Sequence, residues 1–344
     1  MTMHVHSLDE APRAAPEMTP AGLQETRVLT LRRAVAAFLN LGTLALLAAG
    51  MVQVFGAGGW SPTDLVIFGC FLIGAPWTVM GFWNALIGLW LLHGARDGVG
   101  DAAPHLAVDQ SAPIRTRTAL TMFLRNEAPE RSLAKLAEMR RSLDATGQGE
   151  RFDIFVLSDT SDPEIAAAEE AEFERLRPAF GPRAVYRRRE VNAGFKAGNV
   201  RDFLVRHGAG YDFFLPLDTD SLMSGETILK MVRVMEAHPR LGLLQSLVVG
   251  SPATSAFARI FQFGMRAGMR SFTIGAAWWH GDCGPYWGHN ALVRLAPFRR
   301  ACRLPKLPGK APLGGHILSH DQVEAALLRR AGYEVRVMPV ESAS

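Results

Sequence analysis

The stretch YDFFLPLDTDS, residues 211–221, decides the fold that we predict for this chain. Five of its first seven residues are aromatic or branched apolar, which is typical of a strand buried on both faces of a sheet. The run ends at Asp218 and Asp220, two carboxylates separated by one residue. Open α/β sheets bind ligands at the carboxyl ends of their strands, and paired carboxylates there need a compensating cation. The stretch therefore predicts either a site for a divalent metal with a diphosphate or a solvated turn. Residues elsewhere in the sequence are needed to distinguish these two alternatives.

Apolar runs that alternate with helical segments surround this stretch. Further strands are predicted at residues 119–124, 152–157, 184–186 and 241–246, with helices at 132–144, 163–175 and 225–236. Single helices between strands indicate right-handed βαβ units, so we predict an α/β domain with a mainly parallel sheet over residues 117–344. Three strands run directly into polar residues, namely Asn126 and Glu127, Asp159, and Asp218 and Asp220. Because these carboxyl ends meet at one edge, we predict a binding site there.

The sequence NAGFKAGN, residues 192–199, precedes the central strand and is predicted to be a loop. Its glycines let the backbone approach a ligand, and Lys196 supplies a point charge suited to phosphate. The spacing matches neither a P-loop nor a Rossmann dinucleotide site, so the alternative is an ordinary loop with an exposed lysine.

Two uncharged apolar runs precede the α/β region. Residues 34–55 are about long enough to span a bilayer core of roughly 30 Å, and residues 65–92 are longer. We predict two transmembrane helices within residues 31–93, after a disordered cytoplasmic tail at 1–30 and before a linker at 94–116. A buried hairpin of helices is the alternative. Arginines flank both outer ends and the connecting loop contains no Lys or Arg, so both ends are predicted to be cytoplasmic.

The overall composition narrows the class of protein. With 37 Lys and Arg against 33 Asp and Glu the net charge is +4, so we predict no nucleic-acid partner. The 3 cysteines, without a CxxC pair, argue against a disulfide framework. Hydrophobic residues make up 48% of the chain, which agrees with segments that lie in lipid.

Two further stretches have less specific signals. Residues 257–272 have helical spacing, with arginines opposite an apolar face, which predicts a helix lying on a membrane surface or docked on the α/β domain. The run of three arginines at 187–189 is either solvated or faces phosphate.

In order along the chain, several motifs resemble those of the inverting, membrane-embedded family 2 glycosyltransferases. They are Asn126-Glu127, Asp159, KAGN at 196–199, DTD at 218–220, YWGHNA at 286–291 and SHD at 319–321. Three stretches, LDTDSLMSG, YWGHNA and GGHILSHDQVEAALLRRAGYEV, are similar to the glucans biosynthesis glucosyltransferase H group of that family. The resemblance covers roughly residues 31–340. It implies a Rossmann-like GT-A fold, UDP-glucose as donor, Mg²⁺ or Mn²⁺ as cofactor, and a bacterial inner-membrane location with the catalytic domain in the cytoplasm.

The resemblance also implies roles for individual residues. The nucleotide would be bound by Asn126, Glu127, Asp159, Lys196 and Asp218, and the metal by Asp218 and Asp220. Asp321 matches the acidic position of the general base, because inversion needs a base for the acceptor hydroxyl and a Lewis acid for the departing UDP. A simple helix cap is the alternative for Asp321. Contacts to the donor sugar or the glucan acceptor would come from Trp287, His289, Asn290 and His320, with Trp278 and Trp279 extending the aromatic cluster. A zinc pair at His316 and His320 is a weaker alternative.

The sequence also departs from the family pattern. Family members continue beyond it with further membrane helices and a Q-x-x-R-W motif for the acceptor end, and Pro285 follows Cys283 and Gly284 where a polar residue is expected. We predict a membrane-bound glucosyltransferase for the backbone of periplasmic, osmoregulated glucans, with membrane lipid and either a missing channel region or other subunits as partners. The alternatives are a truncated UDP-sugar-binding regulatory protein without turnover and a processive synthase of another, cellulose-like polysaccharide.

Overall fold

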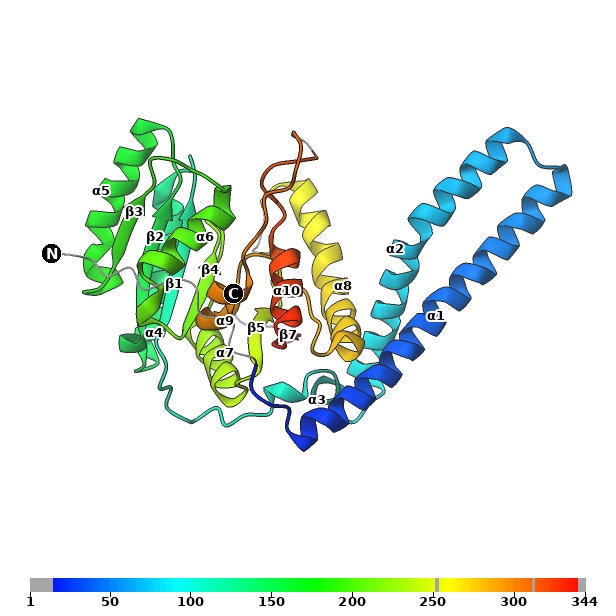
Figure 1. The fold of residues 1–344 in the computed structure, drawn as a ribbon, viewed down its shortest axis with the longest axis horizontal. Helices are drawn as coiled ribbons and strands as arrows, with labels where there is room; N and C mark the ends of the chain where they lie inside the picture. The colour runs from blue at the N-terminus through cyan, green and yellow to red at the C-terminus, as the bar shows by residue number, and fades with distance from the viewer. Residues whose placement is uncertain (1–14, 251–253, 311–312, 340–344) are drawn as a thin grey trace.

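A long pair of helices projects from one side of an α/β domain in the computed structural model, which describes residues 15–250, 254–310 and 313–339 (Figure 1). The pair consists of α1, Pro20–Gly58, and α2, Pro62–His93. Ser61 and Asp64 form a capping box that begins α2 directly after the turn. Since α1 begins at Pro20, the prediction of a disordered tail is wrong for residues 20–30, while residues 1–14 lie outside the described residues.

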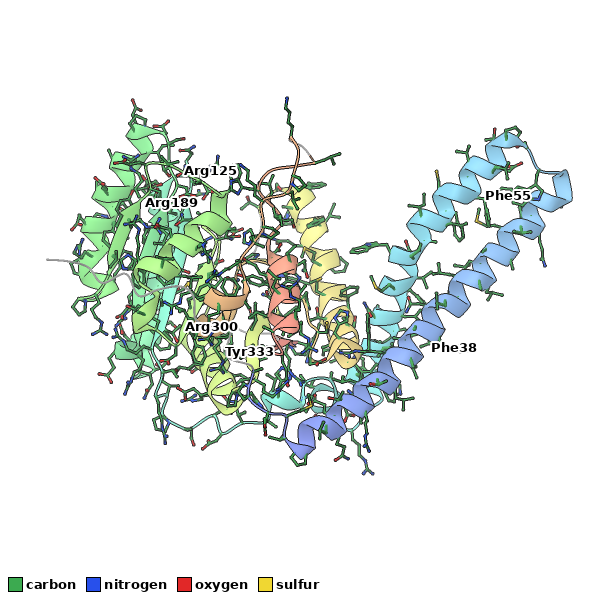
Figure 2. The ribbon with its side chains drawn as sticks, viewed as in Figure 1. Phe38, Phe55, Arg125, Arg189, Arg300 and Tyr333 are labelled. Carbon is green, nitrogen blue, oxygen red and sulfur yellow. The ribbon has the colours of Figure 1, made fainter. Side chains whose placement is uncertain are left out.

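The helix pair is long and apolar enough to cross a membrane. The apolar segments Gly22–Gly58 and Pro62–His93 contain 37 and 32 residues, and few residues of either are buried within the protein. Phe38, for example, is 76% exposed on α1 (Figure 2). Such surfaces need an apolar environment outside the protein, which favours the predicted transmembrane helices over a buried hairpin.

A seven-stranded sheet forms the centre of the α/β domain. Its strands are β1 Thr118–Leu124, β2 Phe152–Ser158, β3 Val185–Arg188, β4 Phe213–Leu217, β5 Leu241–Ser246, β6 Ala291–Arg294 and β7 Glu334–Met338. Their order is β3-β2-β1-β4-β6-β5-β7, and of these described strands β6 alone runs antiparallel to its neighbours. The predicted α/β fold with a mainly parallel sheet is confirmed. The short strand β6 is an addition that the sequence analysis does not predict.

Helices cover both faces of the sheet. One face packs against α4 Pro129–Ala145, α5 Pro163–Phe180 and α7 Gly225–Ala237, and the other against α6 Phe195–Arg206, α9 Leu295–Ala301 and α10 Asp321–Arg330. Alternate residues of one strand enter the two cores: Leu120 and Met122 of β1 belong to the first, Ala119 and Phe123 to the second. This arrangement explains why the central strands β1 and β4 contain no charged residue.

Helix α8, Ala256–His280, connects the helix pair to the domain. Its backbone touches that of α2, because a Cβ on Gly275 would lie 1.9 Å from the carbonyl oxygen of Asn84. A Cβ on Gly88 would meet Ser271 in the same way, at 1.7 Å. Trp279 donates a hydrogen bond of 2.9 Å to the Asn84 side chain, so the tryptophans at the end of α8 face the helix pair and not the predicted sugar site.

Arginines of α1 bind the C-terminal end of α8. Arg33 Nη2 donates to the carbonyl oxygen of His280 at 2.7 Å and also pairs with Asp282 at 2.6 Å. Asp282 in turn pairs with Arg329 of α10 at 2.6 Å. Cations near a helix C-terminus satisfy its free carbonyl groups and complement its dipole. Arg33, one of the arginines that flank the outer ends of the helix pair, therefore also holds α1 on the domain.

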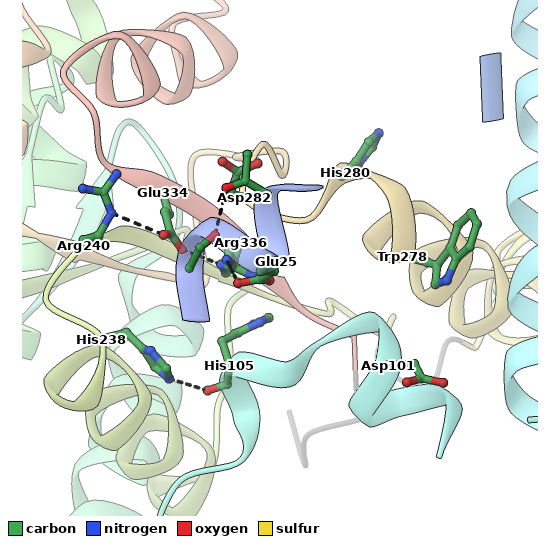
Figure 3. A network of polar contacts seen from close by, with 12 residues as sticks. Glu25, Asp101, His105, His238, Arg240, Trp278, His280, Asp282, Glu334 and Arg336 are labelled. Atoms are coloured by element: carbon green, nitrogen blue, oxygen red, sulfur yellow. Dashed lines mark hydrogen bonds and ion pairs between the residues drawn. The ribbon is translucent and has the colours of Figure 1, made fainter. Parts of the chain in front are cut away.

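A second link joins α1 to the sheet (Figure 3). Arg336 of β7 is 4% exposed and binds both carboxylate oxygens of Glu25, at 2.7 and 3.0 Å, as well as Glu334 at 2.7 Å. The region predicted as a linker contributes the short helices α3, Gly98–Ala102, and η1, Pro104–Leu106. His105 of η1 bonds to the carbonyl oxygen of Val337 at 3.0 Å, so this segment also packs on the domain.

Candidate active site

The carboxyl ends of β1, β2 and β4 place the predicted acidic residues at one edge of the sheet. Leu124 pairs with Ser158 and Met122 with Leu217, so the three parallel strands end close together. Asp159 and Asp218 follow β2 and β4 directly. The structure thus brings these strand ends together as the sequence predicts.

A cleft of about 670 Å³ opens over this edge. The predicted site residues that line it are Glu127, Asp159, Lys196, Asp218 and Asp220. A cleft of this volume is within the range of small-molecule binding sites, about 300–1,000 Å³.

Asn126 is directed away from the cleft. Its Oδ1 accepts hydrogen bonds from the backbone N–H groups of Ser161 and Asp162, at 2.9 and 3.1 Å, and its φ of 55° places it in the left-handed region. Asn126 therefore holds the loop after β2 against the end of β1. Its contact with a nucleotide stays a prediction.

Asp159 is 5% exposed and is held in one orientation. Arg189 donates to both of its carboxylate oxygens, at 2.7 and 2.6 Å, and Asn199 Nδ2 donates at 2.9 Å. A bidentate guanidinium contact fixes both the position and the charge of a carboxylate. Neither partner is predicted from the sequence, although Arg189 belongs to the arginine run and Asn199 ends the KAGN motif.

Lys196 forms an ion pair with Asp218. Gly194, at a φ of 75°, is the N-cap of α6, so Lys196 lies in the first turn of a helix and the prediction of a loop is wrong here. The N-terminus of a helix favours anions, and the lysine adds a full positive charge beside the carboxylate. The cleft therefore combines a fixed cation with the first aspartate of the DTD motif.

Asp220 supplies a second carboxylate at the mouth of the cleft. Its backbone carbonyl accepts a hydrogen bond of 3.0 Å from Lys135, while its carboxylate has no partner among the described residues. Oxygen ligands of this type suit Mg²⁺ and Mn²⁺. Within the described ranges no group of three or more His, Cys, Asp and Glu residues is arranged to hold a metal, which leaves the zinc alternative without support. A cation at Asp218 and Asp220 would need further oxygen atoms from a ligand such as a diphosphate.

The loop before β6 lies at the same edge of the sheet. Because β6 is antiparallel, its first residues lie at the carboxyl edge of β4, where Asn290 N–H donates to the carbonyl of Pro216 at 2.9 Å. The fully buried Gln245, at the end of β5, accepts from the Trp287 N–H at 2.9 Å and donates to the His289 carbonyl at 3.0 Å. The sequence analysis misses Gln245, whose signal is a polar residue within an apolar strand.

Two buried polar atoms in this loop lack partners among the described residues. They are His289 Nδ1 and Asn290 Oδ1, and Asn290 is 4% exposed with a φ of 50°. Buried polar atoms are nearly always hydrogen-bonded. The two atoms therefore have no protein partner among the described residues, and their contact with a sugar stays a prediction.

Asp321 is the first residue of α10 and lies against the loop before β6. A Cβ on Gly288 would be 3.6 Å from Asp321 Cβ and 3.8 Å from its Oδ2. The next residue, Gln322, donates a hydrogen bond of 2.9 Å to the carbonyl of Tyr286. The YWGHNA and SHD motifs are thus in direct contact.

His320 is turned into the domain. Its Nδ1 lies 2.8 Å from Glu324 Oε2, and both side chains are buried. Burial raises the pKa of Glu324, although the hydrogen bond to His320 opposes this shift. A contact of His320 with a sugar stays a prediction.

The mainly parallel α/β sheet, with carboxylates gathered at its strand ends, is that of a GT-A-type glycosyltransferase domain. Residues 125–301 match the profile of Glycosyl transferase family 2, and the chain belongs to this family. The predicted family and fold are therefore confirmed.

Curated relatives carry a more specific name. The chain is 42% identical to glucans biosynthesis glucosyltransferase H of Bradyrhizobium diazoefficiens, over 88% of this chain and 40% of that protein. It is 40% identical to the protein of the same name from Xanthomonas campestris pv. campestris, over 96% of this chain and 52% of that protein. The chain spans about half the length of the curated relatives it matches.

Among solved structures the chain is similar to a mannosyltransferase from Pyrobaculum calidifontis in complex with GDP-Man and Mn²⁺. The identity is 17% and the TM-score is 0.45, over 76% of this chain and 69% of that chain.

Proposed function

We propose that the chain is the catalytic part of a membrane-bound, inverting glucosyltransferase that transfers glucose from UDP-glucose to the backbone of a periplasmic glucan. The observation that carries this proposal is the single cleft that contains the DTD motif and Lys196 and that is also lined by Leu318, three residues before Asp321. Family membership supports glycosyl transfer, and the name shared by the relatives supports glucose as the sugar and a glucan as the product.

The donor would occupy the cleft over β1, β2 and β4. Asp159, oriented by Arg189 and Asn199, retains acceptor capacity for an N–H group of the uracil ring. Lys196 places its charge beside the diphosphate. Asp218 and Asp220 would hold a divalent cation, which would supply Lewis-acid chemistry for the departure of UDP.

Transfer would take place between the donor cleft and Asp321. The Asp321 carboxylate takes the proton of the acceptor hydroxyl group. The oxygen of that hydroxyl group forms a bond to the anomeric carbon of glucose while the bond from this carbon to UDP breaks. Attack from the face opposite UDP inverts the anomeric centre. The unpartnered atoms of His289 and Asn290 would hold sugar hydroxyl groups during this step.

The helix pair would place this chemistry at the inner membrane. The loop between α1 and α2 contains no Lys or Arg, and arginines flank the outer ends of the pair, which supports a cytoplasmic position for the domain. UDP-glucose would then reach the cleft from the cytoplasm, while lipid surrounds α1 and α2.

The proposal is tested with the chain in lipid nanodiscs, labelled UDP-glucose, a glucan acceptor and either Mg²⁺ or Mn²⁺. We expect labelled glucan that depends on the cation and is lost in Asp220→Asn. Because the chain spans about half of its relatives, the second candidate function is nucleotide-sugar binding without turnover. That candidate predicts cation-dependent UDP binding with no labelled product. Stronger competition by UDP-N-acetylglucosamine than by unlabelled UDP-glucose would favour the synthase of another polysaccharide.

A further inference from the structure

A second pocket lies on the other side of α6 from the donor cleft. Its volume is about 730 Å³, and it is bounded by the segment before α6, by α6 and α9, and by residues 302–305 and 316–317. The proposed transfer reaction makes no use of this pocket.

Helix α6 separates the two spaces. Lys196 and Asn199 face the donor cleft, whereas Val200, Arg201 and Leu204 line the second pocket, and no residue lines both. The ion pair between Asp159 and Arg189 forms another part of the partition, with Asp159 on the cleft side and Arg189 on the pocket side. A ligand in the second pocket would therefore not occupy the donor site.

The pocket carries an excess of positive charge. Six arginines line it, against the three carboxylates of Glu190, Asp202 and Glu324. The arginines are Arg187, Arg188, Arg189, Arg201, Arg206 and Arg299.

Half of these arginines are already paired. Arg187 and Arg206 share Asp202, at 3.2 and 2.8 Å, and Arg189 is held by Asp159. The other three, Arg188, Arg201 and Arg299, have no carboxylate partner in the part of the chain that the structure describes, and Arg188 reaches the carbonyl oxygen of Thr160 at 3.4 Å. Unpaired guanidinium groups that converge on a cavity are suited to phosphate, which they bind through paired N–H donors.

Apolar side chains form the rest of the lining. Phe298, Cys302, Leu304, Pro305 and Ile317 lie along the α9 side of the pocket. A free inorganic anion would leave this apolar surface uncovered. A ligand that carries phosphate at one end and an aromatic or apolar body at the other would cover it.

We propose that this pocket binds a phosphorylated small molecule with an aromatic body, of the chemical class of the nucleoside phosphates, at a site distinct from the donor cleft. Arg201 of α6 and Arg299 of α9 bind the phosphate groups from two sides. Leu304, Pro305 and Ile317 contact the base. This site lies beyond the proposed transfer reaction and does not depend on the identity of the sugar donor.

The test uses the whole chain in lipid nanodiscs, ATP as the probe and isothermal titration calorimetry in EDTA, without a sugar nucleotide. We expect saturable binding that Arg201→Gln and Arg299→Gln each weaken by about tenfold, since each removes one charge-assisted contact. Arg300→Gln is the matched control, because Arg300 lies on α9 but does not line the pocket (Figure 2). Lys196→Ala, which alters the donor cleft, should leave ATP binding unchanged. Thermal unfolding of each variant verifies that it is folded.

Several results would overturn the proposal. One is the absence of saturable ATP binding, and another is a loss of ATP affinity in Arg300→Gln equal to that in the two pocket variants. A loss of ATP affinity in Lys196→Ala would assign the binding to the donor cleft. Pyrophosphate provides a further comparison, because it carries phosphate without the aromatic body. We expect it to bind more weakly than ATP, and equal affinity would contradict a role for the apolar side of the pocket. None of these results requires glucose transfer, so failure here is distinct from failure of the proposed function.

Discussion

Gly288 lies against the carboxylate of Asp321, so that a Cβ on Gly288 would be 3.8 Å from Asp321 Oδ2. Its φ of 79° is in the region that favours glycine. This contact joins the loop before β6 to the start of α10, the helix that begins with the proposed base.

We expect Gly288→Ala to lower the rate of glucose transfer by about tenfold while UDP binding is retained. A left-handed conformation costs a non-glycine residue about 1–2 kcal/mol, and relief of that strain would shift Asp321. The measurement is steady-state transfer, with calorimetric titration of UDP. Gly147→Ala is the control, because Gly147 has a φ of 74° but open space around it. An equal loss of rate in both variants would mean that general strain is responsible.

Lys196→Met should weaken UDP binding in the presence of Mn²⁺ by at least about tenfold. The variant removes a charged hydrogen-bonding group worth roughly 1.5–3 kcal/mol and leaves Asp218 without its ion-pair partner. Calorimetric titration of UDP measures the change. Lys230→Met on α7, outside the cleft, should bind UDP like the wild type, and similar affinities for the two variants would refute a role for Lys196 in diphosphate binding.

Lowering the pH should destabilise the contact between α1 and α8, because His280 at the end of α8 becomes protonated. Burial, and secondarily Arg33, lower the pKa of His280 to about 4 from its ordinary value of 6.5. The folded state therefore binds a proton at His280 less readily than the unfolded state does. The contribution of neutral His280 to the free energy of unfolding is complete above pH 6.5 and is lost as the pH falls towards 4. The loss amounts to about 3 kcal/mol from this group.

Thermal unfolding between pH 7 and pH 4 measures the effect. His280→Gln should show a shallower decline than the wild type, because glutamine does not titrate in this range. A decline of the same slope in both proteins would show that another group controls the acid sensitivity.

Gly275→Leu should separate α8 from α2 and lower the unfolding temperature by a few degrees. The position has no room for a side chain, since a Cβ would lie 1.9 Å from the Asn84 carbonyl oxygen, and overpacking costs about 1–3 kcal/mol. Gly268→Leu, on the same helix but with nothing within 4 Å, is the matched control. Equal unfolding temperatures for the two variants would contradict close backbone packing between α2 and α8.

Local patterns are sufficient to predict the sheet and its acidic edge. Each long strand is mainly an apolar run, and the run before Asp218 ends where the strand ends, because strands buried on both faces favour apolar side chains. The sequence does not predict β6, a strand of 4 residues that begins with the last residue of the YWGHNA motif. The first turn of α6 is not predicted, because Gly194, which is the N-cap, resembles a glycine of a loop.

The partners of the site residues depend on tertiary structure. Nothing local to Asp159 indicates that Arg189 will bind it, since the pairing arises only when β3 lies beside β2. Asp321 is singled out in the sequence only by the family resemblance. Its position beside Gly288 follows from the antiparallel direction of β6, which the sequence pattern does not specify.

Substitution of Asp321 tests the central claim most directly. Asp321→Asn preserves the shape of the side chain and removes the base, so we predict that glucose transfer falls by about 10²–10⁴-fold while the affinity for UDP with Mn²⁺ stays within about twofold. The measurement compares labelled product and UDP titrations for the wild type and the variant in nanodiscs. Transfer by Asp321→Asn at the wild-type rate would contradict the account.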